Sequence, residues 1–300
     1  MSRFQVLSKE ASEKLVAEQV AKGRLNFSIG NSKLKKTSKR IKAILEGKGD
    51  LNGFVPRGYR VVSFNTPAGG YKYKGVEYLT CPFAGRCLPI CYARSGPYRW
   101  DSAKIPRIAN HQILMNVERH GRKQDRWTFN SISEGLEAVV SLLLDSIDNL
   151  PKSVGVIRIH DSGDFFSYWY MQAWFMVAAA RPDILFYAYT KSINLLKVAR
   201  KNLSQPENLR ITQSFGGKQD HLIDPDLPHS LIFTGHGATK DEQEANAHKQ
   251  RIALGYPDGN DEIEGDLLAI SGAPRIGLVY HGTAKLTDAQ VNAFQPQPST

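Results

Sequence analysis

The second half of the chain alternates short apolar runs with segments of helical pattern. The first run, VGVIRIH, begins at Val154, and ILFYAYT, LRITQSF, SLIFTGH and IGLVYHG follow it. Helical segments separate these runs, one through Trp174, one through Leu196 and one rich in Glu, Ala and Lys. Continuous apolar strands divided by helices indicate a parallel sheet covered by helices.

The first half of the chain is more helical. Residues 1–50 are mostly polar and helical in pattern, and amphipathic helices are expected at about 102–120 and 131–148. RVVSF at Arg60–Phe64 brings the expected total to about six mostly parallel strands. We therefore predict an α/β fold, a partial (β/α) barrel with a helical N-terminal extension and a Cys-rich cluster loop after its first strand. A flat doubly wound sheet is the alternative, because the pattern does not show whether the ends of the sheet close.

The length of 300 residues, with 41% hydrophobic residues, allows a sizeable core. We expect a helical, basic N-terminal extension over residues 1–55 and a single α/β partial-barrel domain over residues 56–300. No apolar run is long enough for a membrane span, and the first residues lack the apolar core of a signal peptide. We therefore expect a cytoplasmic protein that has no membrane partner.

Polar or glycine-rich tails follow the later strands. The active site of a parallel α/β fold forms at the carboxyl ends of its strands, so we expect these tails to converge on one mouth together with the cysteine loop. The tails are His160–Asp164, Tyr189–Ser192, Ser214–Gly217, Thr234–Gly237 and His281–Thr283.

All three cysteines, Cys81, Cys87 and Cys91, lie within TCPFAGRCLPICYA, and the rest of the chain has none. An odd, clustered set of thiols favours metal ligation over disulfides, and free thiols fit a reducing compartment. With three thiolates on a 4Fe–4S cluster, one iron is left open for a substrate or cofactor. Zinc with a fourth ligand such as His111 or His160 is an alternative. A purely structural role, in which the three cysteines serve as small buried hydrophobic residues, is another alternative.

The formal net charge of +10 raises the prospect of a polyanionic partner. Helical spacing would place Lys35, Lys39 and Lys42 on one face, opposite Ile41 and Ile44. Nucleic-acid contact and a solvated amphipathic helix are both open interpretations of this basic N-terminal segment. Its basic residues, opposed only by Glu46, are Lys33, Lys35, Lys36, Lys39, Arg40, Lys42 and Lys48.

Two further stretches are assigned structural roles. Aromatic residues between Phe165 and Phe175 have helical spacing, which favours core packing over a base-stacking platform. The stretch Asp258–Asp266 lacks the ligand order of an EF-hand and is expected to be an acidic surface loop.

Four blocks, taken together, carry a resemblance to a known family. They are FSIGNSKLKK at Phe27–Lys36, TCPFAGRCLPICYARSGPYR at Thr80–Arg99, RIHDSGDFFS at Arg158–Ser167 and FYAYTKS at Phe186–Ser192. In order and spacing the chain resembles the phage gene-product-eighty-eight family. Its cysteine block followed by Tyr-Ala is also similar to radical S-adenosylmethionine-like phage proteins. The resemblance implies a cluster in a phage protein, located in the cytoplasm of an infected bacterium.

A radical S-adenosylmethionine enzyme would use the three cysteines as iron ligands and would need an electron donor. The open iron would chelate the amino and carboxylate groups of S-adenosylmethionine, whose one-electron cleavage gives a 5′-deoxyadenosyl radical. The substrate could be a nucleic acid. The expected cofactor-binding residues are Ile90 and Tyr92 beside the adenine, Ser162, Gly163 and Asp164 at the amino and ribose groups, and Thr190, Lys191 and Ser192 at the carboxylate or a phosphate.

Two other functions are compatible with the sequence. The first is a basic module, stabilised by zinc or an iron–sulfur cluster, that binds nucleic acid or a host protein without catalysis. The second is a nucleic-acid hydrolase in which His160, Asp161 and Asp164 bind a divalent ion. Bound iron and sulfide would favour the radical enzyme, bound zinc the binding module, and magnesium-dependent cleavage the hydrolase.

Overall fold

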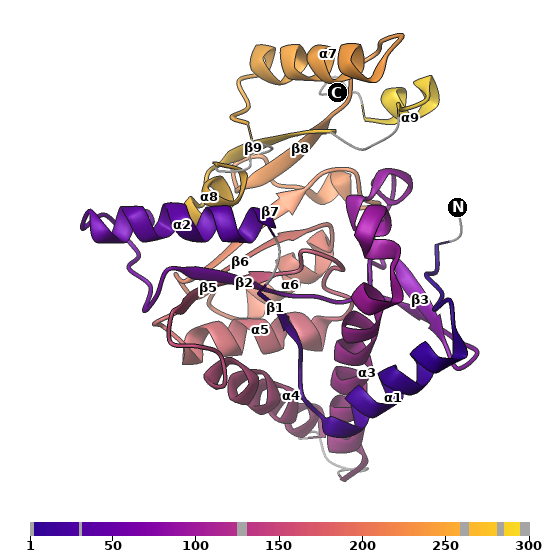
Figure 1. Cartoon of the computed structure of the whole chain (residues 1–300). Helices are drawn as coiled ribbons and strands as arrows, with labels where there is room; N and C mark the ends of the chain where they lie inside the picture. The colour runs from indigo at the N-terminus through magenta and orange to yellow at the C-terminus, as the bar shows by residue number, and fades with distance from the viewer. Residues whose placement is uncertain (1–2, 30–31, 125–130, 259–263, 281–284, 295–300) are drawn as a thin grey trace.

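The computed structural model describes residues 3–29, 32–124, 131–258, 264–280 and 285–294, and a seven-stranded sheet forms its centre (Figure 1). The strand order is β1-β2-β5-β6-β7-β8-β9. All neighbouring pairs are parallel except β1 (Phe27–Ser28), which runs antiparallel to β2. The six parallel strands are those expected from the sequence, namely β2 (Arg60–Phe64), β5 (Val154–Ile159), β6 (Leu185–Thr190), β7 (Leu209–Ser214), β8 (His229–Phe233) and β9 (Arg275–Val279).

Helices cover both faces of the sheet (Figure 1). On β5, Ile157 packs into the larger core and Val156 into the core on the opposite face. Burial of both faces explains why the strands are continuous apolar runs and not alternating ones. The larger core contains α4 (Ser131–Asp148), α5 (Tyr168–Ala180) and α6 (Ile193–Asn202), and the opposite one contains α2 (Ser32–Glu46) and α8 (Glu264–Ser271). The prediction of a mostly parallel α/β fold is confirmed, and closure toward a barrel stays a prediction.

The N-terminal region contributes to this architecture. Its strand β1 pairs with β2, and Leu34 and Ile41 of α2 pack against the sheet, while Lys35, Lys39 and Lys42 are exposed. The separation of residues 1–55 from residues 56–300 as two parts stays a prediction.

A smaller core lies beside the sheet. It joins α1 (Glu10–Lys22) and α3 (Asp101–Gln124) to a hairpin of β3 (Gly70–Tyr73) and β4 (Val76–Leu79). The sequence predicted α3 and α4 but not the hairpin. Its turn residues, Lys74 and Gly75, both have positive φ, as hairpin turns of two residues require.

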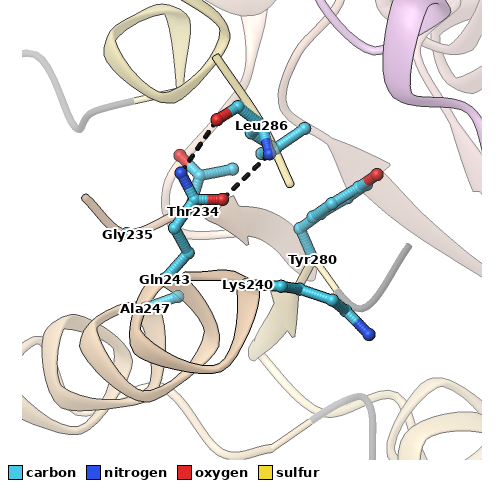
Figure 2. Close-up of a pocket in the computed structure, with 7 residues that line it drawn as sticks. All are labelled: Thr234, Gly235, Lys240, Gln243, Ala247, Tyr280 and Leu286. Atoms are coloured by element: carbon cyan, nitrogen blue, oxygen red, sulfur yellow. Dashed lines mark hydrogen bonds between the residues drawn. The ribbon is translucent and has the colours of Figure 1, made fainter. Parts of the chain in front are cut away.

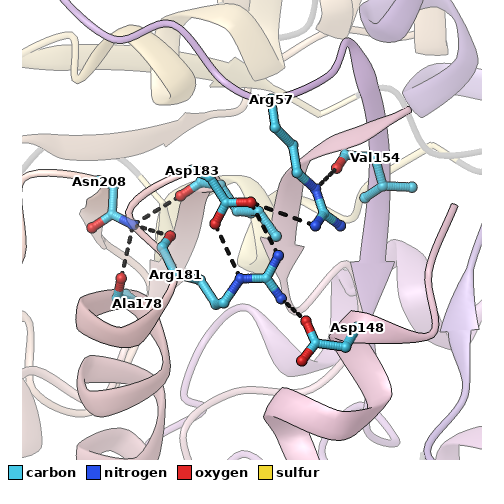
Figure 3. Close-up of polar contacts among 8 residues, drawn as sticks. Arg57, Asp148, Val154, Ala178, Arg181, Asp183 and Asn208 are labelled. Atoms are coloured by element: carbon cyan, nitrogen blue, oxygen red, sulfur yellow. Dashed lines mark hydrogen bonds and ion pairs between the residues drawn. The ribbon is translucent and has the colours of Figure 1, made fainter. Parts of the chain in front are cut away.

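Hydrogen bonds and ion pairs tie together the amino ends of the strands (Figure 3). The Arg57 Nε donates to the carbonyl of Val154, and Arg181 forms an ion pair with Asp183 at 3.0 Å. The amide of Asn208 donates to the carbonyls of Ala178, Arg181 and Ile184. This edge has a structural role, so the opposite edge is the place to look for function.

The expected core role of the aromatic residues is confirmed for Phe165, Tyr170 and Trp174, which are fully buried in the larger core. No helix in the described parts of the chain is both long and apolar enough to cross a membrane.

Candidate functional site

The three cysteines lie on residues 80–100, here called the cysteine segment. Three short 3-10 turns make up its second half, η1 (Leu88–Ile90), η2 (Tyr92–Arg94) and η3 (Gly96–Arg99). Pro89 and Pro97 are the second residues of two of these turns, where the fixed φ and the missing N–H of proline are tolerated. A regular helix would place Cys87 and Cys91 on one face but carry Cys81 away from them, whereas on this path all three thiols interact.

The cysteine segment contacts the tails that follow β5 and β7. The Asp164 N–H donates to the Thr80 carbonyl at 3.1 Å, and the Cys87 N–H donates to the Gly216 carbonyl at 3.0 Å. A Cβ at Gly85 would lie 2.8 Å from the Gly217 carbonyl carbon, so only glycine allows this close backbone approach. The predicted meeting of the cysteines with strand ends is confirmed for these tails.

The tail after β8 behaves differently. The hydroxyl of Thr234 donates to the Val291 carbonyl. Gln243 of α7 (Lys240–Ala253) exchanges two hydrogen bonds with the backbone of Leu286 (Figure 2). The cavity they enclose has a volume of about 10 Å³, which is room for one water molecule. This tail is therefore packed against α7 and the backbone near Leu286, and its convergence with the cysteine segment stays a prediction. The fifth tail, His281–Thr283, lies outside the described residues.

The environment of the thiols affects their ionisation. Burial, and then the charge of Asp164, raise the pKa of Cys81 well above its usual value, although the Gly69 N–H donates to its Sγ at 3.1 Å. Burial and the neighbouring Cys87 raise the pKa of Cys91 to about 11, against the opposing effects of the Ala93 N–H and Lys191. Each thiol therefore lies within electrostatic reach of another.

No group of three or more His, Cys, Asp or Glu side chains in the described residues is already placed to hold a metal ion. The donor set suits an iron–sulfur cluster, because Cys81 and Cys91 already accept backbone N–H groups. Such hydrogen bonds to sulfur tune clusters.

The predicted Asp164 joins two strand ends. One carboxylate oxygen accepts from Thr190 Oγ1 at 2.6 Å and the other from the Lys191 N–H at 2.9 Å. Burial raises its pKa in spite of these donors. The hydroxyl of Ser192 is also engaged, donating to the Phe165 carbonyl. Asp164, Thr190 and Ser192 thus hold the tails of β5 and β6 together.

Two buried hydroxyls beside these residues have no hydrogen-bond partner within the described part of the chain, Ser162 Oγ and Thr66 Oγ1. Gly163, which follows Ser162, packs tightly against Thr66: a Cβ at Gly163 would lie 2.0 Å from Thr66 Oγ1. Thr66 and Asn65 were missed by the sequence analysis. Asn65 Oδ1 accepts the N–H groups of Asp161 and Ser162, which joins the tail of β2 to that of β5. Their position directly after RVVSF was the available signal.

An ion cluster lies on the α2/α8 face of the sheet. Arg158 contacts both Asp161 and Asp266 at 3.2 Å. The hydroxyl of Tyr98 donates to Asp161 Oδ2 at 2.6 Å. Burial disfavours the charge of Arg158, but the surrounding groups, Asp266 and Asp161 among them, outweigh it and raise its pKa. Asp266 is 1% exposed, so the expected acidic surface loop is wrong at this residue; residues 259–263 lie outside the described part.

Two further predicted residues belong to the cysteine segment. Tyr92 has a half-exposed ring, while its hydroxyl reaches inward to Asp161. Ile90, in η1, is partly exposed.

Lys191, another predicted site residue, donates from Nζ to Ser214 Oγ at 2.6 Å, which joins the tail of β6 to the end of β7.

Both candidate histidines for a zinc site are engaged in the core. His111 Nδ1 lies 2.8 Å from the Tyr71 hydroxyl, and His160 Nε2 lies 2.9 Å from the Tyr170 hydroxyl. Burial lowers the pKa of each to about 3, so both are neutral near pH 7.

These features define an α/β protein whose mostly parallel sheet carries, at the carboxyl ends of its strands, three thiols and a buried ion cluster. The profile of the family described as Gene product 88 matches residues 24–277, and the chain belongs to that family. The family resemblance noted in the sequence is thus confirmed, while similarity to radical S-adenosylmethionine proteins stays a prediction.

The chain is similar to the Gene 88 protein of Mycobacterium phage L5, with 32% identity over 116 residues. The match covers 38% of this chain and 43% of the phage protein, so the chain spans less than half the length of that relative. This relative supports the expected bacteriophage origin. No solved structure matches the chain.

Proposed function

We propose that Cys81, Cys87 and Cys91 bind a 4Fe–4S cluster that serves radical S-adenosylmethionine chemistry. The observation that carries the proposal is the gathering of three mutually interacting thiols at the carboxyl edge of a parallel sheet. Crowded, desolvated thiolates are unfavourable by themselves, and a bound cation offsets their repulsion.

The bound cluster and S-adenosylmethionine would supply a carbon-centred radical. The chain's own residues would bind and orient the cofactor and keep water away. The unengaged hydroxyls of Ser162 and Thr66 would accept polar groups of the cofactor, and Ile90 and the ring of Tyr92 would flank its adenine. Asp164, whose oxygens are already engaged, would position Thr190, Lys191 and Ser192 around Gly163 and would not contact the cofactor itself.

We further propose that the six parallel strands form an open half barrel. Their spatial order follows chain order with no reversal, as in successive βα units. The ion cluster of Arg158 would then lie on the inner wall, on the α2/α8 face.

Anaerobic purification with iron, sulfide and zinc analysis tests the proposal, together with electron paramagnetic resonance of the reduced protein with and without S-adenosylmethionine. About four irons per chain are expected, with a spectrum that the cofactor perturbs. Cys81→Ala, Cys87→Ala and Cys91→Ala should each lose the cluster. Ser162→Ala is the control, which should keep the iron but weaken the perturbation by the cofactor.

Iron without a spectral shift would leave a structural or electron-transfer cluster. One zinc and no iron would overturn the radical proposal and favour the second candidate, a metal-stabilised binding module. The exposed basic face of α2, with Lys35, Lys39 and Lys42, is the observation that supports this candidate. A hydrolase would need His160, Asp161 and Asp164 to bind one divalent ion together. Each of them instead contacts a separate partner, namely Tyr170, Arg158 and Thr190 in that order.

A further inference from the structure

The cysteine segment ends in an exposed tryptophan. Trp100 directly follows η3, and 65% of its surface is exposed, although a buried indole would contribute more to stability. By contrast, Trp174 is fully buried in the larger core. A single exposed apolar side chain is ordinary by itself, so its surroundings decide whether this indole belongs to a binding surface.

The indole borders a surface hollow of about 480 Å³, lined by Gly96, Pro97, Arg99 and Trp100. A Cβ at Gly96 would meet no atom within 4 Å, so the hollow is open there. In the described part of the chain, the guanidinium of Arg99 has no hydrogen bond or ion pair, whereas Arg86 of the same segment is paired with Asp220. The hollow thus combines an open aromatic face with an available positive charge.

The outer turn that carries the hollow is held in place from within. The rings of Tyr98 and Tyr92 meet edge to face at 5.7 Å, and the Arg107 guanidinium lies 4.5 Å from the centre of the Tyr98 ring. The Tyr98 hydroxyl is bound to Asp161. Because Tyr92 follows Cys91 directly, this packing joins the turn that carries the hollow to the part of the segment that holds Cys91.

We propose that this hollow binds single-stranded nucleic acid, with a base stacked on Trp100 and the adjoining phosphate on Arg99. Base stacking on aromatic side chains together with phosphate contacts is the usual mode of single-strand binding. The segment has three arginines and no acidic residue between Thr80 and Trp100, and the chain carries a formal charge of +10. Charge of this sign favours a polyanion over an acid-poor protein surface.

The inference deepens the proposed function, because it identifies the substrate class of the cysteine site, and in that respect it rests on the proposed function. The binding itself does not depend on the cluster. It also differs from a contact through the basic face of α2, which presents lysines but no stacking side chain.

The test is fluorescence anisotropy of the full-length, anaerobically purified protein with labelled single-stranded DNA and RNA of about 15 nucleotides. Trp100→Ala should weaken binding about 10-fold, and Trp100→Phe, which keeps an aromatic face, should restore most of it. Arg99→Gln should lower the slope of log affinity against log salt by about 0.7, the value of one phosphate contact on a single strand.

Arg40→Gln, at an exposed position of α2, is the matched control, since it removes one positive charge from the other basic surface. It should leave the affinity and the salt slope unchanged. A loss with Arg40→Gln but not with Trp100→Ala or Arg99→Gln would overturn the proposal in favour of α2. Absence of oligonucleotide binding by the unsubstituted protein would also overturn it and would favour a protein partner for the hollow.

The two proposals fail separately. Bound iron and a spectrum perturbed by the cofactor, without oligonucleotide binding, would contradict the nucleic-acid role of the hollow and leave the cluster proposal intact. Oligonucleotide binding that requires Trp100, in a protein that contains no iron, would support the hollow as a binding site and contradict the radical mechanism. The DNA and RNA arms distinguish the two sources of a single strand.

Discussion

The Tyr92 hydroxyl donates a hydrogen bond to Asp161 Oδ1 at 2.9 Å, and so the residue after Cys91 is joined to the tail of β5. Arg158 stands behind this pair, in contact with both the Asp161 carboxylate and, at 3.3 Å, the Tyr92 hydroxyl. The position of the last cysteine is thereby coupled to a buried ion cluster in the sheet.

Tyr92→Phe should lower the free energy of unfolding by about 1–3 kcal/mol, because buried polar groups lose a hydrogen-bond partner while the ring is kept. Urea denaturation measures the change. Tyr168→Phe is the control, since its hydroxyl accepts from Asn202 at an exposed site and its loss should cost less. Equal losses for the two variants would mean that Tyr92 does not link the segment to the cluster.

Gly163→Ala should destabilise the protein more than Gly53→Ala does. Both glycines have positive φ, +94° and +81°, so both substitutions carry backbone strain of about 1 kcal/mol. Only at Gly163 does the new Cβ also meet Thr66, whereas nothing lies within 4 Å at Gly53. Thermal and urea unfolding of the two variants would isolate the contact, and similar values would show that Gly163 and Thr66 are not in tight contact.

Alkylation of Cys91 in the metal-free protein should be slow near neutral pH and should rise about tenfold per pH unit up to about pH 11, since the thiolate is the reactive form. Lys191→Gln removes a positive charge that lowers the pKa of Cys91, so the rate at a given pH should fall several-fold. Site-resolved mass spectrometry measures the rate. Lys197→Gln, at an exposed position of α6, should have no effect, and an equal effect would exclude a specific influence of Lys191.

Asp101→Asn should cost about 1–3 kcal/mol at neutral pH, because the carboxylate joins α1 to α3. Burial raises the pKa of Asp101, but hydrogen bonds from Ser12, Ser8 and Lys104 outweigh this effect and lower it below the ordinary 3.8. A lowered folded pKa gives stability that is present above the unfolded value and is lost as the pH falls toward the folded value.

Unfolding free energies measured from about pH 6 down to about pH 2 should therefore decline more steeply for the unsubstituted protein than for Asp101→Asn. Asp226→Asn, at an exposed loop position, should keep the steep decline. Parallel curves for the unsubstituted protein and Asp101→Asn would contradict the assignment.

The six parallel strands could be predicted from the sequence because each is a short run rich in apolar and β-branched residues, mostly buried and bounded by polar or turn residues. The contact of Cys87 with Gly216 could be expected in outline, since the carboxyl ends of parallel strands share one edge. The β3–β4 hairpin was missed because its strands are short and polar on one side, and their pairing depends on a turn with positive φ.

Local patterns along the chain thus determined the succession of the six parallel strands, several of the helices and the grouping of the thiols, because periodicity and spacing are properties of neighbours in sequence. Only the tertiary structure decided which side chains meet. Asp266 lies 108 residues from Arg158 and is buried against it, and Asn65 joins the N–H groups of Asp161 and Ser162, 96 and 97 residues away. Tertiary packing also placed Gln243 beside the tail of β8 and left Trp100 exposed. Such pairings depend on packing between distant segments, for which no local pattern carries a signal.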